Sequence, residues 1–197
     1  MKPILIDLPL PLLTPLLRLE PPKIGDGKAI NDAVLSNIEN IAKWMPWANP
    51  PPSAEQSEEY ARNAIAEFTQ RKILAMLIWD RHTGQLIGSS GLHDIDWDVP
   101  RFETGYWLRK ESLGQGFAME AVNALARYAF QELNAKRLAI HCDKDNHNSR
   151  SIPEKLGFDL EGTLRNYFLK PGTNRPRETL VYSRIDLNGL PELDVQW

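Results

Sequence analysis

A glycine-rich turn in the middle of the chain has the residue types and the spacing to hold an anion. Gly114 and Gly116 lie in the turn Leu113-Gly-Gln-Gly-Phe-Ala118, directly after a strand-like segment. Apolar residues then recur at helical spacing as far as Leu133, which predicts an amphipathic helix. The first turn of a helix leaves backbone N–H groups without partners and carries the positive end of the helix dipole. Because glycines let these N–H groups approach an anion closely, the turn predicts a cradle for phosphate.

The spacing of the glycines excludes two common nucleotide-binding motifs. No Gly-Lys-Ser or Gly-Lys-Thr closes the turn, so it is not a Walker A loop. Met119 stands where a dinucleotide-binding fingerprint has its third glycine. Taken alone, the turn is equally consistent with a strand-to-helix connection that binds nothing.

Further motifs in a fixed order extend the pattern beyond the turn. The ordered set is Glu103-Thr-Gly-Tyr-Trp-Leu108, Leu113-Gly-Gln-Gly-Phe-Ala118, Asn146-x-x-Ser149 and Glu154-Lys-Leu-Gly-Phe158. It resembles the GNAT superfamily of N-acetyltransferases, and within it the ribosomal-protein N-terminal acetyltransferases of the RimJ/RimL type. Leu17-Arg-Leu-Glu20 and Trp44-Met-Pro-Trp47 also look like that group. The likeness covers roughly residues 15 to 186.

The resemblance implies an α+β fold in a single acetyltransferase domain, 1–197. Helices would flank a central mixed, mostly antiparallel sheet in which two strands splay apart. The pantetheine arm of acetyl-CoA would lie in that gap, bonded to the main chain of Trp107, Leu108 and Arg109. The pyrophosphate would bind the backbone of Leu113, Gly114, Gln115, Gly116, Phe117 and Ala118. Leu113 stands where the superfamily often has Gln or Arg, a difference that we expect to weaken binding without abolishing it.

The reaction that the resemblance implies is acetyl transfer from a thioester to an amine, by direct attack in a ternary complex. No well-supported nucleophile argues for a covalent route. The amine must lose a proton, and Glu103 is the predicted base, acting through a water. Glu103 shares a strand face with Gly105, although a solvated or ion-paired glutamate is an equal alternative. Rival carboxylates, which could instead form an acidic rim or a solvated loop, are Asp94, Asp96 and Asp98.

Ser149 is the predicted acid, because the matching serine in the resembling group lies near the CoA sulfur and can donate to the thiolate. Asn146 would orient the loop or hydrogen-bond the cofactor. Helix capping is the alternative for both residues, since Asn and Ser are favoured at helix starts. Ser151-Ile-Pro-Glu154 is itself a capping-box pattern, so Pro153 could move the helix start to Ser151 and displace Ser149.

The acceptor that the resemblance favours is a protein N-terminal α-amine. Its pKa of ~8 leaves roughly ten percent as free base at neutral pH, far more than a lysine amine with a pKa of ~10.4. Residues predicted to contact the acceptor are Trp44, Trp47, Asp94 and Tyr167, although loop anchoring or core packing would also explain the aromatic ones. Two alternatives stay open: a small polyamine or antibiotic amine as acceptor, and an acyl-CoA-binding sensor without catalysis.

Composition limits the partners of the chain. The net charge of −3 does not favour nucleic acid or an anionic membrane surface. Asp7 and early prolines argue against a signal peptide or a membrane span, so a cytoplasmic location is expected. The single cysteine, Cys142, excludes an intrachain disulfide and a cysteine-rich zinc site, and no metal is predicted. The oligomeric state stays open, although similar enzymes are often dimers.

An alternation of strands and helices must position these residues. The expected helices are 31–43, 53–68 with a capping box at its start, a long helix from the glycine turn to 133, and 151–156. The expected strands are 16–20, 73–79, 86–92, 102–108, 137–143, 158–168 and 178–185. The strand-helix-strand order after Gly105 predicts a crossover in a mixed sheet. The tail after Leu187 is expected to be a loose end.

Overall fold

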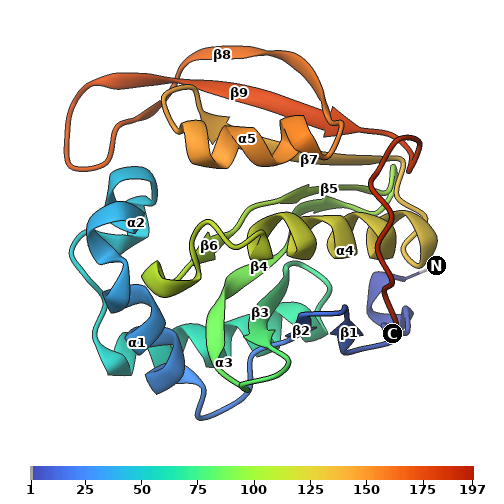
Figure 1. Ribbon diagram of the computed structural model, residues 1–197, viewed down its shortest axis with the longest axis horizontal. Helices are drawn as coiled ribbons and strands as arrows, with labels where there is room; N and C mark the ends of the chain where they lie inside the picture. The colour runs from blue at the N-terminus through green and yellow to red at the C-terminus, as the bar shows by residue number, and fades with distance from the viewer. Residues whose placement is uncertain (1) are drawn as a thin grey trace.

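Residues 2–197 are described by a computed structural model with one nine-stranded sheet (Figure 1). The strands are β1 (Leu12–Leu13), β2 (Leu17–Glu20), β3 (Leu74–Asp80), β4 (Leu86–Asp96), β5 (Arg101–Thr104), β6 (Trp107–Leu108), β7 (Arg137–Asp143), β8 (Asp159–Leu169) and β9 (Pro176–Arg184). Their order is β1-β2-β3-β4-β5-β7-β9-β8, and β6 also pairs with β4. All pairs are antiparallel except β5 with β7, so the predicted mixed, mostly antiparallel sheet is confirmed.

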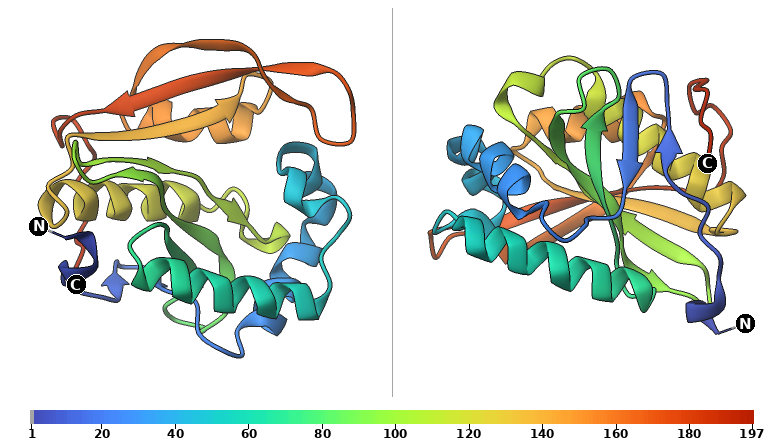
Figure 2. Two further views of the ribbon diagram at one scale, coloured as in Figure 1. Left: turned by 180° about the vertical axis from the view of Figure 1, so that it is seen from behind. Right: turned by 90° about the horizontal axis from the view of Figure 1, so that it is seen from below.

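Helices cover both faces of this sheet (Figure 2). They are α1 (Gly27–Ser36), α2 (Ile38–Trp44), α3 (Ala54–Thr69), α4 (Phe117–Gln131) and α5 (His147–Lys155). α4 and α5 lie on one face, where Ala121 and Leu125 join strand residues such as Met76 in the main core. α1 and α3 lie on the other face, where Val34 and Ala61 pack into a smaller cluster. The sheet thus separates a main core on one face from a smaller apolar cluster on the other.

The sheet opens next to its parallel pairing. β5 pairs with β7 at only three positions, the last of which joins Glu103 and Ala139. The chain then leaves strand conformation at Gly105 and Tyr106. β6 continues beside β4 alone, while β7 continues beside β9. The two strands therefore diverge as predicted, although the expected strand 102–108 is interrupted.

The expected helix 31–43 is wrong, because α1 and α2 are separate helices that meet at Asn37. Asn37 has φ −128° and ψ 22°, outside the helical region. Its buried side chain donates a hydrogen bond of 2.9 Å to the carbonyl oxygen of Leu108 in β6. The break in the helix therefore ties the α1–α2 junction to the diverging strand.

The start of α3 follows its sequence signal closely. Ser53 Oγ accepts a hydrogen bond of 3.1 Å from the backbone N–H of Gln56. The Gln56 side chain in turn accepts one of 2.8 Å from the backbone N–H of Ser53. The predicted capping box is confirmed, and it satisfies two backbone donors that the helix cannot satisfy itself.

The C-terminal tail is packed rather than loose, which corrects the expectation for residues after Leu187. Leu190 is buried, and Trp197 packs edge-on against Tyr128 of α4 with ring centroids 5.7 Å apart. The backbone of Gln196 exchanges hydrogen bonds of 2.8 and 2.9 Å with Leu13 of β1. Apolar burial and edge pairing together outweigh the entropy of a free end.

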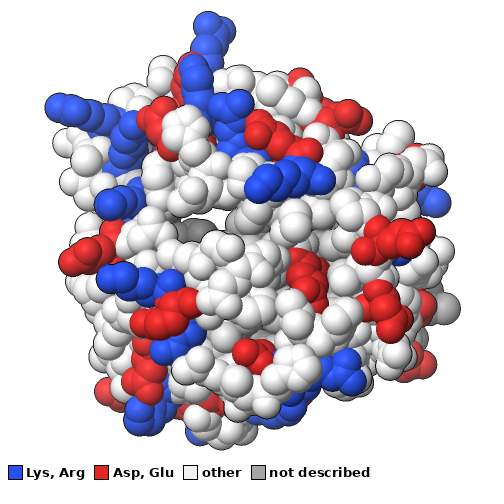
Figure 3. All heavy atoms as spheres, viewed as in Figure 1, with Lys and Arg blue, Asp and Glu red and all other residues white. Residues whose placement is uncertain are grey.

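Charged side chains of both signs share the surface. Figure 3 shows basic groups over the β8, β9 and α5 part of one face, with acidic groups interspersed among them. Ion pairs join Lys144 to Glu178 at 2.7 Å and Lys170 to Asp145 at 2.7 Å. These cations are therefore largely compensated by neighbouring carboxylates.

Candidate active site

The glycine turn adopts the backbone conformation that its sequence demands. Gly114 has φ +75° and Gly116 has φ +85°, in the left-handed region that side chains other than glycine rarely enter. Gly116 is the residue that caps α4. A Cβ atom at either glycine would meet open space, so backbone conformation rather than crowding selects glycine here.

The amides of this turn are available to an anion. Among residues 2–197, none of the backbone N–H groups from residue 114 to residue 119 donates to another protein group. Glu120 lies in the first turn of α4, but its carboxylate accepts from Thr14 Oγ1 at 2.5 Å and from Leu16 N–H at 3.0 Å. Its negative charge is thereby engaged by β1–β2 rather than by the turn. A run of free N–H groups at a helix N-terminus fits a diphosphate.

Part of the predicted pantetheine-binding backbone is already used by the protein. Arg109 N–H donates to the carbonyl oxygen of Ile87 at 2.8 Å. The Leu108 carbonyl oxygen accepts from Asn37, as described above. The predicted contacts of Trp107, Leu108 and Arg109 with pantetheine stay predictions, and these two bonds reduce the groups that could make them.

α5 begins earlier than the local sequence suggests, so the expected start at Ser151 is wrong. Asn146 caps the helix by accepting a hydrogen bond of 3.2 Å from the backbone N–H of Ser149. Ser149 therefore lies in the first turn, and Pro153 lies inside the helix without moving its start. Tyr106, from the interruption between β5 and β6, contacts Ser149 through its hydroxyl group.

Glu103 lies in a half-buried, polar cluster beside the splay. Its Oε2 atom is 3.2 Å from Nδ1 of His141 on β7, and it pairs across the strands with His93 of β4. Burial, and secondarily the charge of Asp94, raises the pKa of Glu103 to about 7. Burial also lowers the pKa of His141, so both partners favour their neutral forms. A carboxyl group with this pKa can exchange a proton near neutral pH.

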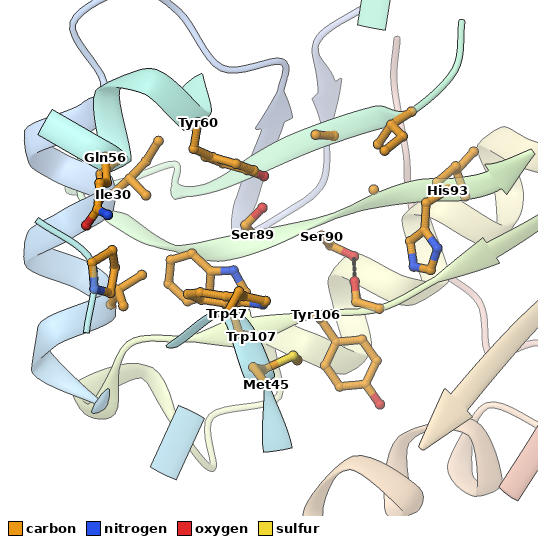
Figure 4. Close-up of a pocket in the computed structure, with 18 of the residues that line it drawn as sticks. Ile30, Met45, Trp47, Gln56, Tyr60, Ser89, Ser90, His93, Tyr106 and Trp107 are labelled. Carbon is orange, nitrogen blue, oxygen red and sulfur yellow. Dashed lines mark hydrogen bonds between the residues drawn. The ribbon is translucent and has the colours of Figure 1, made fainter. Parts of the chain in front are cut away.

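An apolar cavity of about 650 Å³ lies between the sheet and α1–α3 (Figure 4). Its walls include Met45, Trp47, Tyr60 and Trp107, and the Trp47 and Trp107 rings lie 6.2 Å apart. No Asp or Glu of the described chain lines it. One end reaches Tyr106, so the cavity runs from the aromatic walls toward the splayed strands.

His93 is a functional candidate that the sequence reasoning missed. Its ring lines the cavity, and its Nε2 atom lies over Gly105. Burial lowers the pKa of His93, so a neutral imidazole faces the cavity. Its place opposite Glu103 comes from the register of β4 with β5, which no local sequence pattern reveals.

The predicted acceptor residues do not all meet at the cavity. Trp47 lines it, but Trp44, Asp94 and Tyr167 do not. Trp44 offers its carbonyl oxygen to Arg177 at 3.2 Å. Tyr167 is half exposed and packs on Phe168 with ring centroids 4.5 Å apart.

The rival carboxylates form a turn rather than an acidic pocket. Asp96 accepts from the N–H groups of Asp98 and Val99 and lies 3.4 Å from Arg101. Asp94 is exposed and lies 3.9 Å from the same arginine. Of the alternatives for these carboxylates, this arrangement fits the solvated loop, here with ion pairs to Arg101.

The cysteine thiol and the other potential ligand groups offer no further reactive centre in the described residues. Cys142 is buried, and burial raises the pKa of its thiol to about 11, which disfavours a nucleophilic thiolate. Within residues 2–197, no cluster of three His, Cys, Asp or Glu side chains could hold a metal ion. In the same range, no helix is long and apolar enough to cross a membrane.

Comparison with known proteins shows which family the chain resembles in sequence. Residues 17–159 match the model of the acetyltransferase (GNAT) domain. YdaF of Bacillus subtilis, named as a candidate ribosomal N-acetyltransferase, is 34% identical over 154 residues, covering 76% of this chain and 80% of YdaF. The ribosomal-protein-serine acetyltransferase of Escherichia coli is 30% identical over 125 residues, covering 62% of this chain and 69% of that protein.

A solved structure agrees with the fold. The RimL ribosomal L7/L12 α-N-protein acetyltransferase, in complex with coenzyme A, superposes with a TM-score of 0.82 at 21% identity. The match covers 88% of this chain and 96% of that one. The chain therefore belongs to the GNAT acetyltransferase family, as an acyl-CoA-dependent N-acetyltransferase of the RimJ/RimL-like type.

Proposed function

We propose that this enzyme transfers the acetyl group of acetyl-CoA to a protein N-terminal α-amine, by direct attack in a ternary complex. The observation that carries the proposal is the run of free amides from residue 114 to residue 119 at the N-terminus of α4. Such a run suits the diphosphate of the donor. The names of YdaF and of the E. coli relative, which refer to ribosomal-protein acetylation, support a protein acceptor.

The cavity supports an N-terminal acceptor over a polyamine. A polyamine carries several positive charges, and binding them in an apolar cavity without carboxylates would leave those charges desolvated and unpaired. A peptide N-terminus carries one charge, which is lost when the amine becomes a nucleophile. The apolar walls are then compatible with the side chain that follows it.

In the proposed step the nitrogen loses two protons in all. The protonated amine gives the first proton to a base, and the neutral nitrogen attacks the thioester carbonyl carbon. The carbon–sulfur bond breaks, Ser149 donates its hydroxyl proton to the departing thiolate, and the second proton that the nitrogen loses on becoming an amide returns to Ser149. Glu103 is the proposed base through a water, and His93, which lines the cavity directly, is the second candidate for this role.

A screen of acceptors tests the proposed function. Short peptides with each of the common N-terminal residues would be incubated with acetyl-CoA, and free thiol and product mass would be measured. We expect turnover with free N-termini and none with N-terminally acetylated peptides of the same sequence. Turnover with spermidine alone would contradict the proposed acceptor. Binding of acetyl-CoA without turnover on any amine would contradict catalysis altogether.

The pH dependence of kcat/KM tests the base. Glu103 must be ionised to accept a proton, and its raised pKa of about 7 places that ionisation near neutrality. We therefore expect kcat/KM to rise with pH through about 7 in the wild type. In Glu103→Gln this limb should disappear and kcat/KM should fall about 100-fold.

The acceptor amine contributes a second limb at ~8, which separates the two groups. Acceptors of different amine pKa should move that limb and leave the lower one in place. Glu132→Gln, an exposed glutamate beyond the C-terminal end of α4, is the matched control and should keep both limbs. If the lower limb persists in Glu103→Gln and vanishes in His93→Gln, then His93 is the base instead.

A further inference from the structure

Pro153 removes a backbone donor from α5 at a specific place. In a regular helix, the N–H of residue 153 would donate to the carbonyl oxygen of residue 149. Proline has no N–H, so the Ser149 carbonyl oxygen loses its helical partner. The carbonyl is in the turn that carries the proposed acid, and a partly buried carbonyl without a partner is costly.

Tyr106 supplies the missing donor from another part of the fold. Its hydroxyl group donates a hydrogen bond of 2.8 Å to the Ser149 carbonyl oxygen. Figure 4 shows the Tyr106 hydroxyl turned away from Trp107 and Ser90. Tyr106 follows β5 at the point where the strands diverge, so this bond joins α5 to the splayed strand.

The same hydroxyl also contacts the Ser149 side chain. Tyr106 Oη lies 3.2 Å from Ser149 Oγ. A phenol has one hydrogen, and the carbonyl can only accept, so that hydrogen is committed to the shorter bond. Toward Ser149 Oγ, Tyr106 therefore acts as an acceptor in the enzyme without substrate, and the Ser149 hydrogen turns about the Cβ–Oγ bond to the thiolate when the thiolate leaves. Burial raises the pKa of Tyr106, so the hydroxyl stays protonated.

We propose that Tyr106 is a positioning residue, which holds both the main chain and the hydroxyl group of Ser149 at the place where the thiolate leaves. The inference rests on the proposed function, in which Ser149 donates the proton. Pro153 and Tyr106 act together. The proline leaves the Ser149 carbonyl oxygen without a helical donor, and the tyrosine hydroxyl donates to that oxygen and so joins α5 to the splayed strand. Without the hydroxyl, the Ser149 side chain would sample several rotamers.

A double-mutant cycle between Tyr106→Phe and Ser149→Ala tests the proposal. Tyr106→Phe should lower kcat about 10-fold, because small displacements of a reacting group carry large kinetic costs, and leave KM for acetyl-CoA within about twofold. In the Ser149→Ala background the same change should alter kcat less than about twofold, since residues that act as a unit are not additive. Tyr128→Phe removes a buried hydroxyl without a partner in the described chain, and it is the matched control with unchanged kcat.

Each outcome decides the proposal. Full turnover in Ser149→Ala would overturn the proposed acid and this inference together. A low kcat in Ser149→Ala, with Tyr106→Phe either fully active or fully additive, would overturn the inference alone.

A second variant separates folding from positioning. In Tyr106→Phe/Pro153→Ala, the new N–H of residue 153 can serve the Ser149 carbonyl and restore helix stability. We expect the melting temperature to recover and kcat to stay low, because the contact with Ser149 Oγ is still absent. Recovery of kcat together with stability would mean that Tyr106 only supports the fold, which would overturn the proposal.

Discussion

Replacing Ser149 with alanine is expected to lower kcat about 100-fold, the usual contribution of a positioned acid, while acetyl-CoA still binds. The hydroxyl lies in the first turn of α5, where Asn146 fixes the backbone and Tyr106 contacts the side chain. Alanine keeps the helix and removes only the proton donor. Steady-state thiol release would measure kcat, and calorimetry would measure acetyl-CoA affinity.

Ser151→Ala is the matched control on the same helix. The Ser151 hydroxyl donates to the carbonyl oxygen of Asn148 at 2.9 Å, a bond within its own turn. We expect this variant to keep its kcat. Equal losses in the two variants would point to damage of α5, and no loss in Ser149→Ala would remove the serine from the mechanism.

Replacing Gly116 with valine is expected to weaken acetyl-CoA binding about 10- to 100-fold, which corresponds to the loss of one charge-assisted hydrogen bond from a backbone amide. The φ of +85° at this position is strained for a β-branched residue by about 1–2 kcal/mol. The backbone would relax toward negative φ and turn the amides after it away from the anion. Titration of acetyl-CoA would measure the change.

Gly84→Val separates this loss from general destabilisation. Gly84 has φ +70° in the turn between β3 and β4, also with open space around it. Both variants should lose similar stability on thermal unfolding. Only Gly116→Val should lose affinity, so normal binding by that variant would contradict the role of the turn as the diphosphate site.

Local chemistry allowed the turn and the best-defined helix start to be predicted. Gly114 and Gly116 adopt a left-handed backbone conformation that other residues rarely enter. Ser53 and Gln56 satisfy the free backbone N–H groups at the start of their own helix. Each of these signals acts within a few residues. The order of strands and helices predicted a crossover in a mixed sheet, and the resemblance to the GNAT superfamily implied its mostly antiparallel arrangement.

Features that depend on distant partners could not be predicted in this way. Asn37 lies in the middle of a helical pattern, and the helix is interrupted where its side chain donates a hydrogen bond to the carbonyl oxygen of Leu108, far along the chain. Pro153 argued for a later start of α5, and the start at His147 places Tyr106 in contact with Ser149. No sequence pattern predicted these contacts, since hydrogen bonds between distant elements leave no periodic trace.

The location of His93 illustrates the same limit at the candidate site. An isolated histidine on a strand has no local pattern to distinguish it. Its place opposite Glu103 depends on the register of two strands, and its exposure to the cavity depends on α1 and α3. Only the assembled sheet brings the imidazole and the carboxyl group to one face.

The packed tail has a remote consequence for the donor site. Pro191 offers its carbonyl oxygen to Asn123 and Arg127 at 2.9 Å each, and Trp197 abuts Tyr128, so the tail clamps the outer half of α4. The opposite end of α4 presents the free amides that are proposed to bind the pyrophosphate. The tail therefore helps to fix the direction of the helix whose N-terminus is proposed to hold the donor.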